Sequence, residues 1–200
     1  MAILVQKFGG SSLANGEKIR RAAGLSLSAV RQGFQVVVVV SAQGDLTDQL
    51  LTQAGELCRA PSPRELDQLL SAGEQMSAAL FAMALEEFGA PAVSLTGWQA
   101  GILTGRTHQN ASIQTVRPGR ILAELNQGKI AVVAGFQGIS AAGEVTTLGR
   151  GGSDITAVAL AAALKGERCQ IYTDVDGVYT ADPRLVPTAR RFEAIGYDDM

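Results

Sequence analysis

The chain has 200 residues, of which 46% are hydrophobic and 18% are charged, and its formal net charge is −2. These values are typical of a globular domain that is large enough for one sizeable core. They exclude a general nucleic-acid or membrane-surface binder, because such proteins carry an excess of basic residues.

Short β-branched stretches alternate along the chain with longer stretches of helical period. This pattern predicts strands over residues 3–8, 35–41, 92–95, 130–134 and 170–173. It predicts helices over residues 17–31, 47–58, 63–88, 118–126 and 154–164. The run 36–40 is apolar on both faces, as in strands that are covered by helices on both sides. The expected fold class is α/β, a three-layer α/β/α sandwich around a mainly parallel open sheet.

Two regions are less regular. Residues 97–114 are polar and rich in Gly and Thr, which is typical of a hairpin or a mobile loop. Residues 192–200 stop in mid-pattern, and the last four, from Tyr197 to Met200, resemble the first turn of an unfinished helix. We therefore expect the chain to be a fragment.

The residues suited to metals or disulfides are few and scattered. Cys58 and Cys169 match neither a zinc spacing nor a disulfide framework. His108 is the only histidine, which argues against a His-based metal site and against a Ser-His-Asp triad. The first residues lack the basic region and cleavage site of a secretory signal, and the run 36–40 is far shorter than the ~20 apolar residues that span a membrane. We expect a cytoplasmic protein without metal-ligating side chains.

In open α/β sheets, ligands bind beyond the carboxyl ends of the strands, so the loops there are candidates for a site. The first such loop is Lys7-Phe8-Gly9-Gly10-Ser11-Ser12. Its paired glycines let backbone N–H groups approach an anion, the following helix N-terminus adds partial positive charge, and Lys7 supplies a point charge for a phosphate. A tight turn with a surface lysine is the alternative for this loop alone. The spacing of a Walker loop is absent from the chain.

Two further segments offer groups for a small polar substrate. Ser41 and Thr47, after the Val-rich strand, could donate hydroxyls, although Thr47 and Asp48 could also simply cap a helix. Glu74 lies in the small-residue stretch SAGE, where its carboxylate could bind a substrate ammonium. An isolated glutamate is more often solvated or capping, so the residue type alone does not decide between these roles.

The stretch TTLGRGGSDITA, residues 146–157, places glycines, an arginine and an aspartate at the start of a predicted apolar helix. The glycines supply backbone that a ligand can approach closely; they are Gly149, Gly151 and Gly152. Ser153 or Asp154 begins the helix, and Arg150 supplies a planar, always-charged fork suited to a carboxylate. Asp154 could cap the helix, or orient Lys7 and a metal-bound phosphate. The dinucleotide fingerprint is not met, because its third spaced glycine is missing.

The last candidate segment is IYTDVDGVYTADPR, residues 171–184, which follows a predicted strand and is too long for a simple turn. Its hydroxyls and carboxylates, including Thr173 and Asp174, could hold a ribose and a base. Tyr179 could lie against an adenine, and Arg184 could meet a phosphate. This composition is typical of a nucleotide-binding segment.

Together these loops favour phosphoryl transfer between two anions, a nucleotide phosphate and an acidic acceptor. At ~4 Å and an effective dielectric constant near 20, two unit charges repel by roughly 4 kcal/mol. Lys7, Arg150 and the amides of the glycine loops supply the positive charge that such a site needs. A carboxylate acceptor is already deprotonated at pH 7, so no histidine base is required.

Six motifs resemble those of the aspartokinases, which belong to the amino acid kinase superfamily, and they follow that family's order over the whole chain. They are KFGGSS at 7–12, SAQGDLTD at 41–48, SAGEQ at 71–75, GFQG at 135–138, TTLGRGGSD at 146–154 and YTDVDGVYTADPR at 172–184. The last two are specific, whereas the SAxG and GFxG pieces would be weak alone.

The resemblance implies phosphorylation of the side-chain carboxylate of L-aspartate to 4-phospho-L-aspartate, with ATP and Mg²⁺, as the first step toward lysine, threonine and methionine. It implies catalytic roles for Lys7 and Asp154, with Asp154 organising the lysine. The ATP-binding residues would be Lys7, Phe8, Gly9, Gly10, Thr173, Asp174, Tyr179 and Arg184. The aspartate-binding residues would be Ser41, Thr47, Glu74, Arg150, Gly151 and Ser153, with Arg150 on a carboxylate and Glu74 near the amine.

Aspartokinases continue beyond these motifs, through a second nucleotide-side lysine and paired ACT domains that bind feedback inhibitors. We therefore expect residues 1–200 to be one amino acid kinase domain that is C-terminally incomplete, lacks ACT domains and has little or no turnover by itself. The implied partners are a further copy of the chain or a regulatory ACT-domain subunit, with no nucleic acid and no membrane. Two alternatives stay open: another amino acid kinase (glutamate, acetylglutamate or nucleoside monophosphate type), and a non-catalytic amino-acid or nucleotide binding module.

Overall fold

A five-stranded sheet forms the centre of the molecule. The computed structural model describes residues 1–174 and 177–196, so Val175 and Asp176 of the expected nucleotide segment, and the helix turn expected from residue 197, lie outside the described residues. The strands of the sheet are β1 (Ile3–Phe8), β2 (Gln35–Val40), β3 (Ala92–Leu95), β6 (Ile130–Ala134) and β9 (Arg168–Tyr172). Their order is β3-β6-β2-β1-β9, and every neighbouring pair is parallel. The five predicted strands are confirmed, with small differences at their ends.

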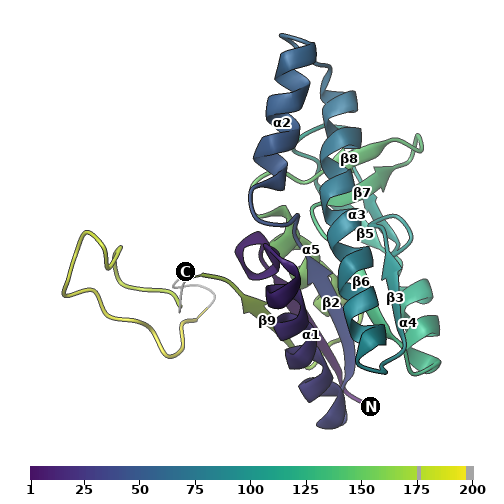
Figure 1. Ribbon diagram of the computed structural model, residues 1–200, viewed down its shortest axis with the longest axis vertical. Helices are drawn as coiled ribbons and strands as arrows, with labels where there is room; N and C mark the ends of the chain where they lie inside the picture. The colour runs from purple at the N-terminus through teal and green to yellow at the C-terminus, as the bar shows by residue number, and fades with distance from the viewer. Residues whose placement is uncertain (175–176, 197–200) are drawn as a thin grey trace.

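Helices cover both faces of this sheet (Figure 1). The helices of the two outer layers are α1 (Gly16–Arg31), α3 (Pro63–Glu87), α4 (Gly119–Asn126) and α5 (Gly152–Ala163). Val36 and Val38 of β2 pack with α1 and α3, whereas Val37 and Val39 pack with α4 and α5. Because the side chains of a strand alternate between faces, a run of valines is buried on both sides. The predicted three-layer α/β/α sandwich is confirmed.

A second, four-stranded sheet is not predicted from the sequence. Its strands are β4 (Ile102–Thr104), β5 (Ile113–Val116), β7 (Gln137–Ser140) and β8 (Val145–Thr147), in the order β5-β4-β7-β8. β4 and β5 pair in antiparallel fashion, so the hairpin expected as one alternative for residues 97–114 is confirmed. β7 and β8 form another antiparallel pair. Each of these strands has only three or four residues, too few for a visible alternation of apolar and polar side chains.

Short helical segments follow the carboxyl ends of β1 and β2. A 3₁₀ helix, η1 (Gly10–Leu13), comes directly after β1, and α2 (Leu46–Leu57) follows β2 after a short loop. α2 buries none of its residues, and Figure 1 shows it standing beyond the sheet beside α3. Within the part of the chain that the structure describes, no helix has the length and apolar character that crossing a membrane requires.

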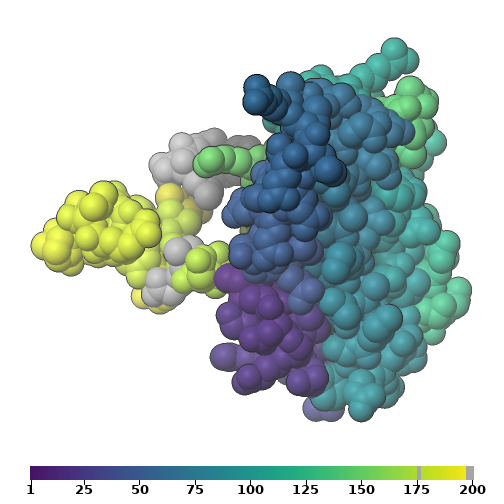
Figure 2. All heavy atoms as spheres, turned by 45° about the horizontal axis from the view of Figure 1, so that its top comes forward, coloured from purple at the N-terminus to yellow at the C-terminus, as the bar shows by residue number. Residues whose placement is uncertain are grey.

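The segment after β9 leaves the main body of the molecule. Residues 177–196 project from it and are coloured yellow in Figures 1 and 2. A single antiparallel β-bridge joins Tyr179 to Arg191 within this segment. Most of its residues are exposed, so it adds little to either core.

Candidate active site

Strand β1, which lies between β2 and β9, presents Lys7 at the carboxyl end of the parallel sheet. Lys7 is the penultimate residue of β1, and its neighbours on the adjoining strands are Val39 and Ile171. Its Nζ atom lies 2.7 Å from Oδ1 of Asp154, in the first turn of α5. The Lys7 side chain is 9% exposed and that of Asp154 is 44% exposed, so the pair lies at an opening to solvent. The ion pair fixes the ammonium and leaves it within reach of a ligand.

The loop after β1 is held between β9 and the loop after β2. The Gly9 N–H donates to the carbonyl of Tyr172 (3.1 Å), and the Gly44 N–H donates to the carbonyl of Gly10 (3.0 Å). The rings of Phe8 and Tyr172 stack, with their centroids 4.6 Å apart and an interplanar angle of 9°. The backbone of this loop is therefore fixed on both sides, as an anion-binding turn requires.

Glu74 is a carboxylate that α3 carries into the site. Residues 71–74 lie in the middle of this helix, and Glu74 is only 4% exposed. Its Oε1 accepts a hydrogen bond from the backbone N–H of Ala42 (3.0 Å), while its Oε2 has no hydrogen-bond partner among the described residues. Burial raises the pKa of Glu74 to about 7, and the bond from Ala42 opposes this only in part. A cation that reaches Oε2 would favour the ionised form.

Arg150 lies in the glycine loop between β8 and α5. Gly149 and Gly151 on either side have φ angles of 81° and 70°, left-handed conformations that glycine adopts without strain. Gly151 is the N-cap residue of α5, so the positive end of the helix dipole lies beside the arginine. Arg150 is exposed, and it forms no ion pair with a carboxylate of residues 1–174 or 177–196. Its guanidinium is available to an anionic ligand.

Most of the predicted site residues line one cleft of about 620 Å³ at the carboxyl ends of β1 and β2. They are Lys7, Gly10, Ser41, Thr47, Glu74, Arg150, Gly151, Ser153 and Asp154. Lys7 and Arg150 therefore open onto the same space. Asp48 and Gln109 also line this cleft, and Gln109 is one that the sequence analysis does not single out.

A neighbouring cavity of about 370 Å³ holds three more of the predicted residues. Phe8, Thr173 and Asp174 line it, together with Lys18 and Arg21 of α1. The Thr173 hydroxyl donates to Oδ1 of Asp174 (3.0 Å). This cavity shares the loop after β1 with the cleft, because residue 10 lines the cleft and residues 11 and 12 line the cavity.

Tyr179 and Arg184 lie apart from the other predicted residues. Both belong to the projecting segment (Figure 2), and neither lines the cleft or the neighbouring cavity. The Arg184 guanidinium binds the carboxylate of Asp182, with its Nε 3.1 Å from Oδ1 and a terminal nitrogen 2.9 Å from Oδ2. The role of Tyr179 and Arg184 on a nucleotide stays a prediction from the motif.

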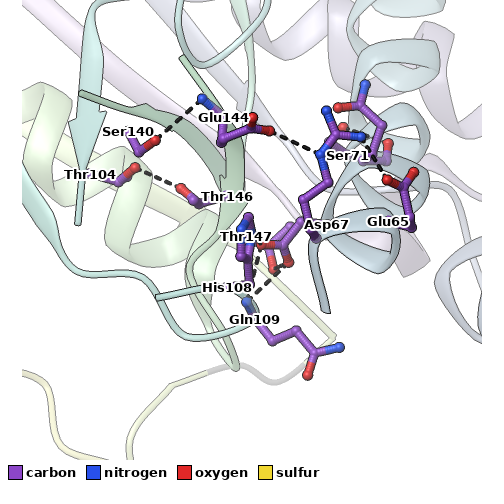
Figure 3. A network of polar contacts seen from close by, with 12 residues as sticks. Glu65, Asp67, Ser71, Thr104, His108, Gln109, Ser140, Glu144, Thr146 and Thr147 are labelled. Carbon is purple, nitrogen blue, oxygen red and sulfur yellow. Dashed lines mark hydrogen bonds and ion pairs between the residues drawn. The ribbon is translucent and has the colours of Figure 1, made fainter. Parts of the chain in front are cut away.

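A buried acid that the sequence does not single out lies beside the cleft. Asp67 of α3 is fully buried and contacts His108, Gln109 and Thr147 (Figure 3). Asp67 and Glu74 are seven residues apart, which is about two helical turns, so both lie on the same side of α3. This spacing is the one signal in the sequence that could point to Asp67.

The cleft can bind two anionic groups and one cationic group close together. Lys7, Arg150 and the N-terminal end of α5 supply positive charge around the cleft. Glu74 supplies one buried carboxylate oxygen without a partner in the part of the chain that the structure describes. Fixed charges and dipoles of this kind stabilise the charge that develops in a group-transfer reaction.

Comparisons with known proteins agree with this architecture. The model of the amino acid kinase family matches residues 2–200. The aspartokinase of Geobacillus stearothermophilus is 57% identical over 200 residues, which cover 100% of this chain and 49% of that protein. The chain spans about half the length of the curated relatives it matches.

Solved structures share the fold. The aspartate kinase from Synechocystis is 50% identical, with a TM-score of 0.81, over 94% of this chain and 31% of that chain. Aspartokinase III from E. coli, solved in complex with aspartate and ADP, is 31% identical, with a TM-score of 0.84, over 95% of this chain and 53% of that chain. By sequence from residue 2 to residue 200, and by fold, the chain belongs to the amino acid kinase family.

Proposed function

We propose that the chain is the catalytic part of an aspartate kinase, which transfers the γ-phosphoryl group of ATP to the side-chain carboxylate of L-aspartate. The observation that carries this proposal is that Lys7, Arg150 and Glu74 line one cleft. The relatives named aspartokinase, and the E. coli structure with aspartate and ADP, support this substrate pair. The product would be 4-phospho-L-aspartate, made in the cytoplasm as the first step toward lysine, threonine and methionine.

The amino acid would be bound at both of its charged ends. Arg150, whose fork suits a carboxylate, would hold one carboxylate of aspartate, and the unpartnered Oε2 of Glu74 would accept from its ammonium. Hydroxyls and backbone around the cleft would complete the contacts; these come from Ser41, Thr47, Gly151 and Ser153. An ammonium beside Glu74 would also compensate the burial of that carboxylate.

The phosphates of ATP would lie over the turn after β1. The Lys7 ammonium and the backbone of Phe8, Gly9 and Gly10 would bind them, and the nucleoside would extend toward Thr173 and Asp174 at the end of β9. Roles for Tyr179 and Arg184 on the nucleotide are part of the proposal through the motif alone.

Mg²⁺ fits the acids that line the cleft. This ion binds mainly through substrate phosphates, waters and one or two carboxylates, rather than through a cage of protein ligands. Among the described residues, no group of three or more His, Cys, Asp or Glu side chains could hold a metal ion. The Mg²⁺ that accompanies ATP would be held mainly by the phosphates and would supply further neutralising charge, and Asp154, beside Lys7 and partly exposed, would orient the lysine and the metal-bound phosphate.

The transfer step needs no proton acceptor. A side-chain oxygen of aspartate, ionised at neutral pH, forms the bond to the γ-phosphorus, while the bond from that phosphorus to the bridging oxygen breaks and ADP leaves with the electron pair. Two anions at ~4 Å repel by roughly 4 kcal/mol at an effective dielectric constant near 20. Lys7 offsets this repulsion at the transferred phosphate, Arg150 does so at the acceptor, and Asp154 orients Lys7.

Hydroxylamine trapping of acyl phosphates tests the proposal. Two proteins are assayed: the chain alone, and a chimera in which the chain takes the place of the matching segment of the G. stearothermophilus aspartokinase. Each is tested with aspartate, glutamate and acetylglutamate as acceptors. We expect hydroxamate from the chimera with aspartate and little from the chain alone. A preference for glutamate or acetylglutamate would assign a sister amino acid kinase instead. Binding of aspartate and Mg-ATP by calorimetry, without turnover even in the chimera, would assign a non-catalytic binding module.

A further inference from the structure

Asp67 is a buried acid whose hydrogen-bond partners all come from distant parts of the chain. It lies on α3 and is 0% exposed. Thr147 Oγ1 donates to its Oδ1 (2.6 Å), the Gln109 N–H donates to both of its oxygens (3.0 and 3.1 Å), and His108 Nδ1 lies 2.7 Å from its Oδ2. Figure 3 shows His108 and Thr147 beside the carboxylate, and the side chain of Gln109 directed away from it. In the described part of the chain, its ion pairs include neither a lysine nor an arginine.

Of the partners of Asp67, Gln109 lines the cleft and Thr147 lies three residues before Arg150. His108 and Gln109 lie between β4 and β5, and Thr147 is the last residue of β8. The two segments are joined, because the Ala111 N–H donates to the Thr147 carbonyl (2.8 Å). The glycine loop starts two residues after Thr147, and a Cβ atom on Gly149 would lie 2.8 Å from Oδ1 of Asn110. The position of the arginine loop is therefore coupled to that of residues 108–111.

The other side of the contact is the helix that carries Glu74. Asp67 and Glu74 lie on the same side of α3, about two turns apart. Between them, the carbonyl of Ser71 accepts a hydrogen bond from Gln137 Nε2 of β7 (2.8 Å). The second sheet is thus attached to α3 at several levels, since Arg64 also pairs with Glu144 and Gln75 also donates to Gln137. The Asp67 level is the one that bonds to Thr147, two residues before the glycine loop.

We propose that Asp67 is a positioning residue for the amino-acid substrate. Through Thr147 and Gln109 it sets the separation of Arg150 and Glu74, so that one ligand can engage both with its carboxylate and its ammonium. This inference rests on the proposed function, because it takes those two side chains as the amino-acid contacts. A small displacement of either contact weakens binding of a short ligand, since both ends must be held at once. The ATP side, at the turn after β1, does not depend on this contact.

The test compares two neighbouring threonines. Thr147→Val removes the hydroxyl that donates to Asp67, whereas Thr146→Val removes a hydroxyl that makes an equally short buried contact with Thr104 Oγ1 (2.6 Å), within the second sheet. Thr146 and Thr147 are both buried, so the substitutions cost similar packing. Asp67→Asn is measured beside them. Calorimetric titrations with L-aspartate and with Mg-ATP are carried out on the purified 200-residue chain, after circular dichroism shows that each variant is folded.

We expect Thr147→Val and Asp67→Asn to weaken aspartate binding by about tenfold or more, the equivalent of one lost hydrogen bond, and Mg-ATP binding by less than about twofold. Thr146→Val should bind both ligands as the wild type does. Equal aspartate affinity in Thr147→Val and Thr146→Val would overturn the inference alone, as would a loss of both ligands to the same extent in Thr147→Val. A wild-type chain that binds Mg-ATP but no aspartate would contradict the proposed function itself, and this inference with it.

Discussion

The Nζ atom of Lys7 lies 2.7 Å from Oδ1 of Asp154, and this contact joins strand β1 to the first turn of α5. Lys129 makes an ion pair of the same length with Oε2 of Glu124, on α4. The two pairs differ in place: Lys7 and Asp154 line the cleft, and Lys129 and Glu124 do not. The molecule therefore contains a matched control for the role of the cleft lysine.

Replacing Lys7 by alanine should abolish phosphoryl transfer and leave the fold intact. Its charge acts on the transferred phosphate, and the loss of one such group costs about 10²–10³-fold in turnover. Asp154, which stays behind, is 44% exposed and can be hydrated, so little stability is lost. The measurement is hydroxamate formation by the chimera with the G. stearothermophilus aspartokinase, with thermal unfolding as the test of the fold. The control, Lys129→Ala, should keep its turnover. Near-normal turnover in Lys7→Ala would reject the role of Lys7.

Replacing Arg150 by alanine should mainly raise the aspartate requirement. A charge-assisted, two-pronged contact with a carboxylate is worth about 1.5–3 kcal/mol, so the aspartate concentration for half-maximal rate should rise by roughly 10–100-fold. Arg150→Lys keeps the charge but loses the planar fork, so its aspartate concentration for half-maximal rate should lie between those of the wild type and Arg150→Ala. Arg106, another exposed arginine, lies between β4 and β5 and does not line the cleft, so Arg106→Ala serves as the control. Unchanged aspartate dependence in Arg150→Ala would rule out a carboxylate contact.

The main sheet could be predicted because each of its elements carries a local signal. The valine run of β2 indicates a strand buried on both faces, and the helical period of residues 63–88 indicates α3. The structure shows the Ser62 side chain accepting from the Glu65 N–H (3.4 Å). Parallel strands also bring their following loops to one edge, which is why Lys7 and Ser41 could be expected in the same cleft.

The second sheet and the Asp67 contacts could not be predicted in this way. β4 and β8 have three residues each, and their pairing partners are decided by contacts across the fold. His108 and Thr147 are 41 and 80 residues from Asp67, so no local pattern links them. Glu74 is intermediate, because its motif could be recognised, but its burial and its bond to the Ala42 N–H depend on how α3 packs against the loop after β2.

Glu74 should make the protein less stable as the pH rises toward neutrality. Its pKa is about 7 in the folded protein, because burial disfavours the charge, and near the ordinary glutamate value of 4.5 in the unfolded chain. The unfolded chain therefore ionises first, and stability falls between pH 4.5 and 7 by roughly 3 kcal/mol, at about 1.4 kcal/mol per pH unit. Glu74→Gln should remove this loss. Urea unfolding at pH 5 and pH 8 measures it.

The control for this pH effect is Glu65→Gln, in an exposed glutamate at the start of the same helix. Its stability should differ from that of the wild type by a similar amount at pH 5 and at pH 8, because Glu65 is solvated. For Glu74→Gln, the free energy of unfolding relative to that of the wild type should instead increase from pH 5 to pH 8. A constant difference between Glu74→Gln and the wild type would mean that Glu74 is already ionised at pH 5.

The same carboxylate should couple aspartate binding to the release of a proton. At pH 6 the Glu74 side chain of the free protein is mostly protonated, since its pKa is about 7. The ammonium of bound aspartate favours the ionised form, so binding at pH 6 should release close to one proton, and affinity should rise with pH by up to about tenfold per unit until pH 7. Calorimetry in buffers of different ionisation enthalpy measures the released proton. Glu74→Gln should bind aspartate weakly and release no proton at pH 6. Tight binding at pH 6 that takes up or releases no proton would place the ammonium away from Glu74.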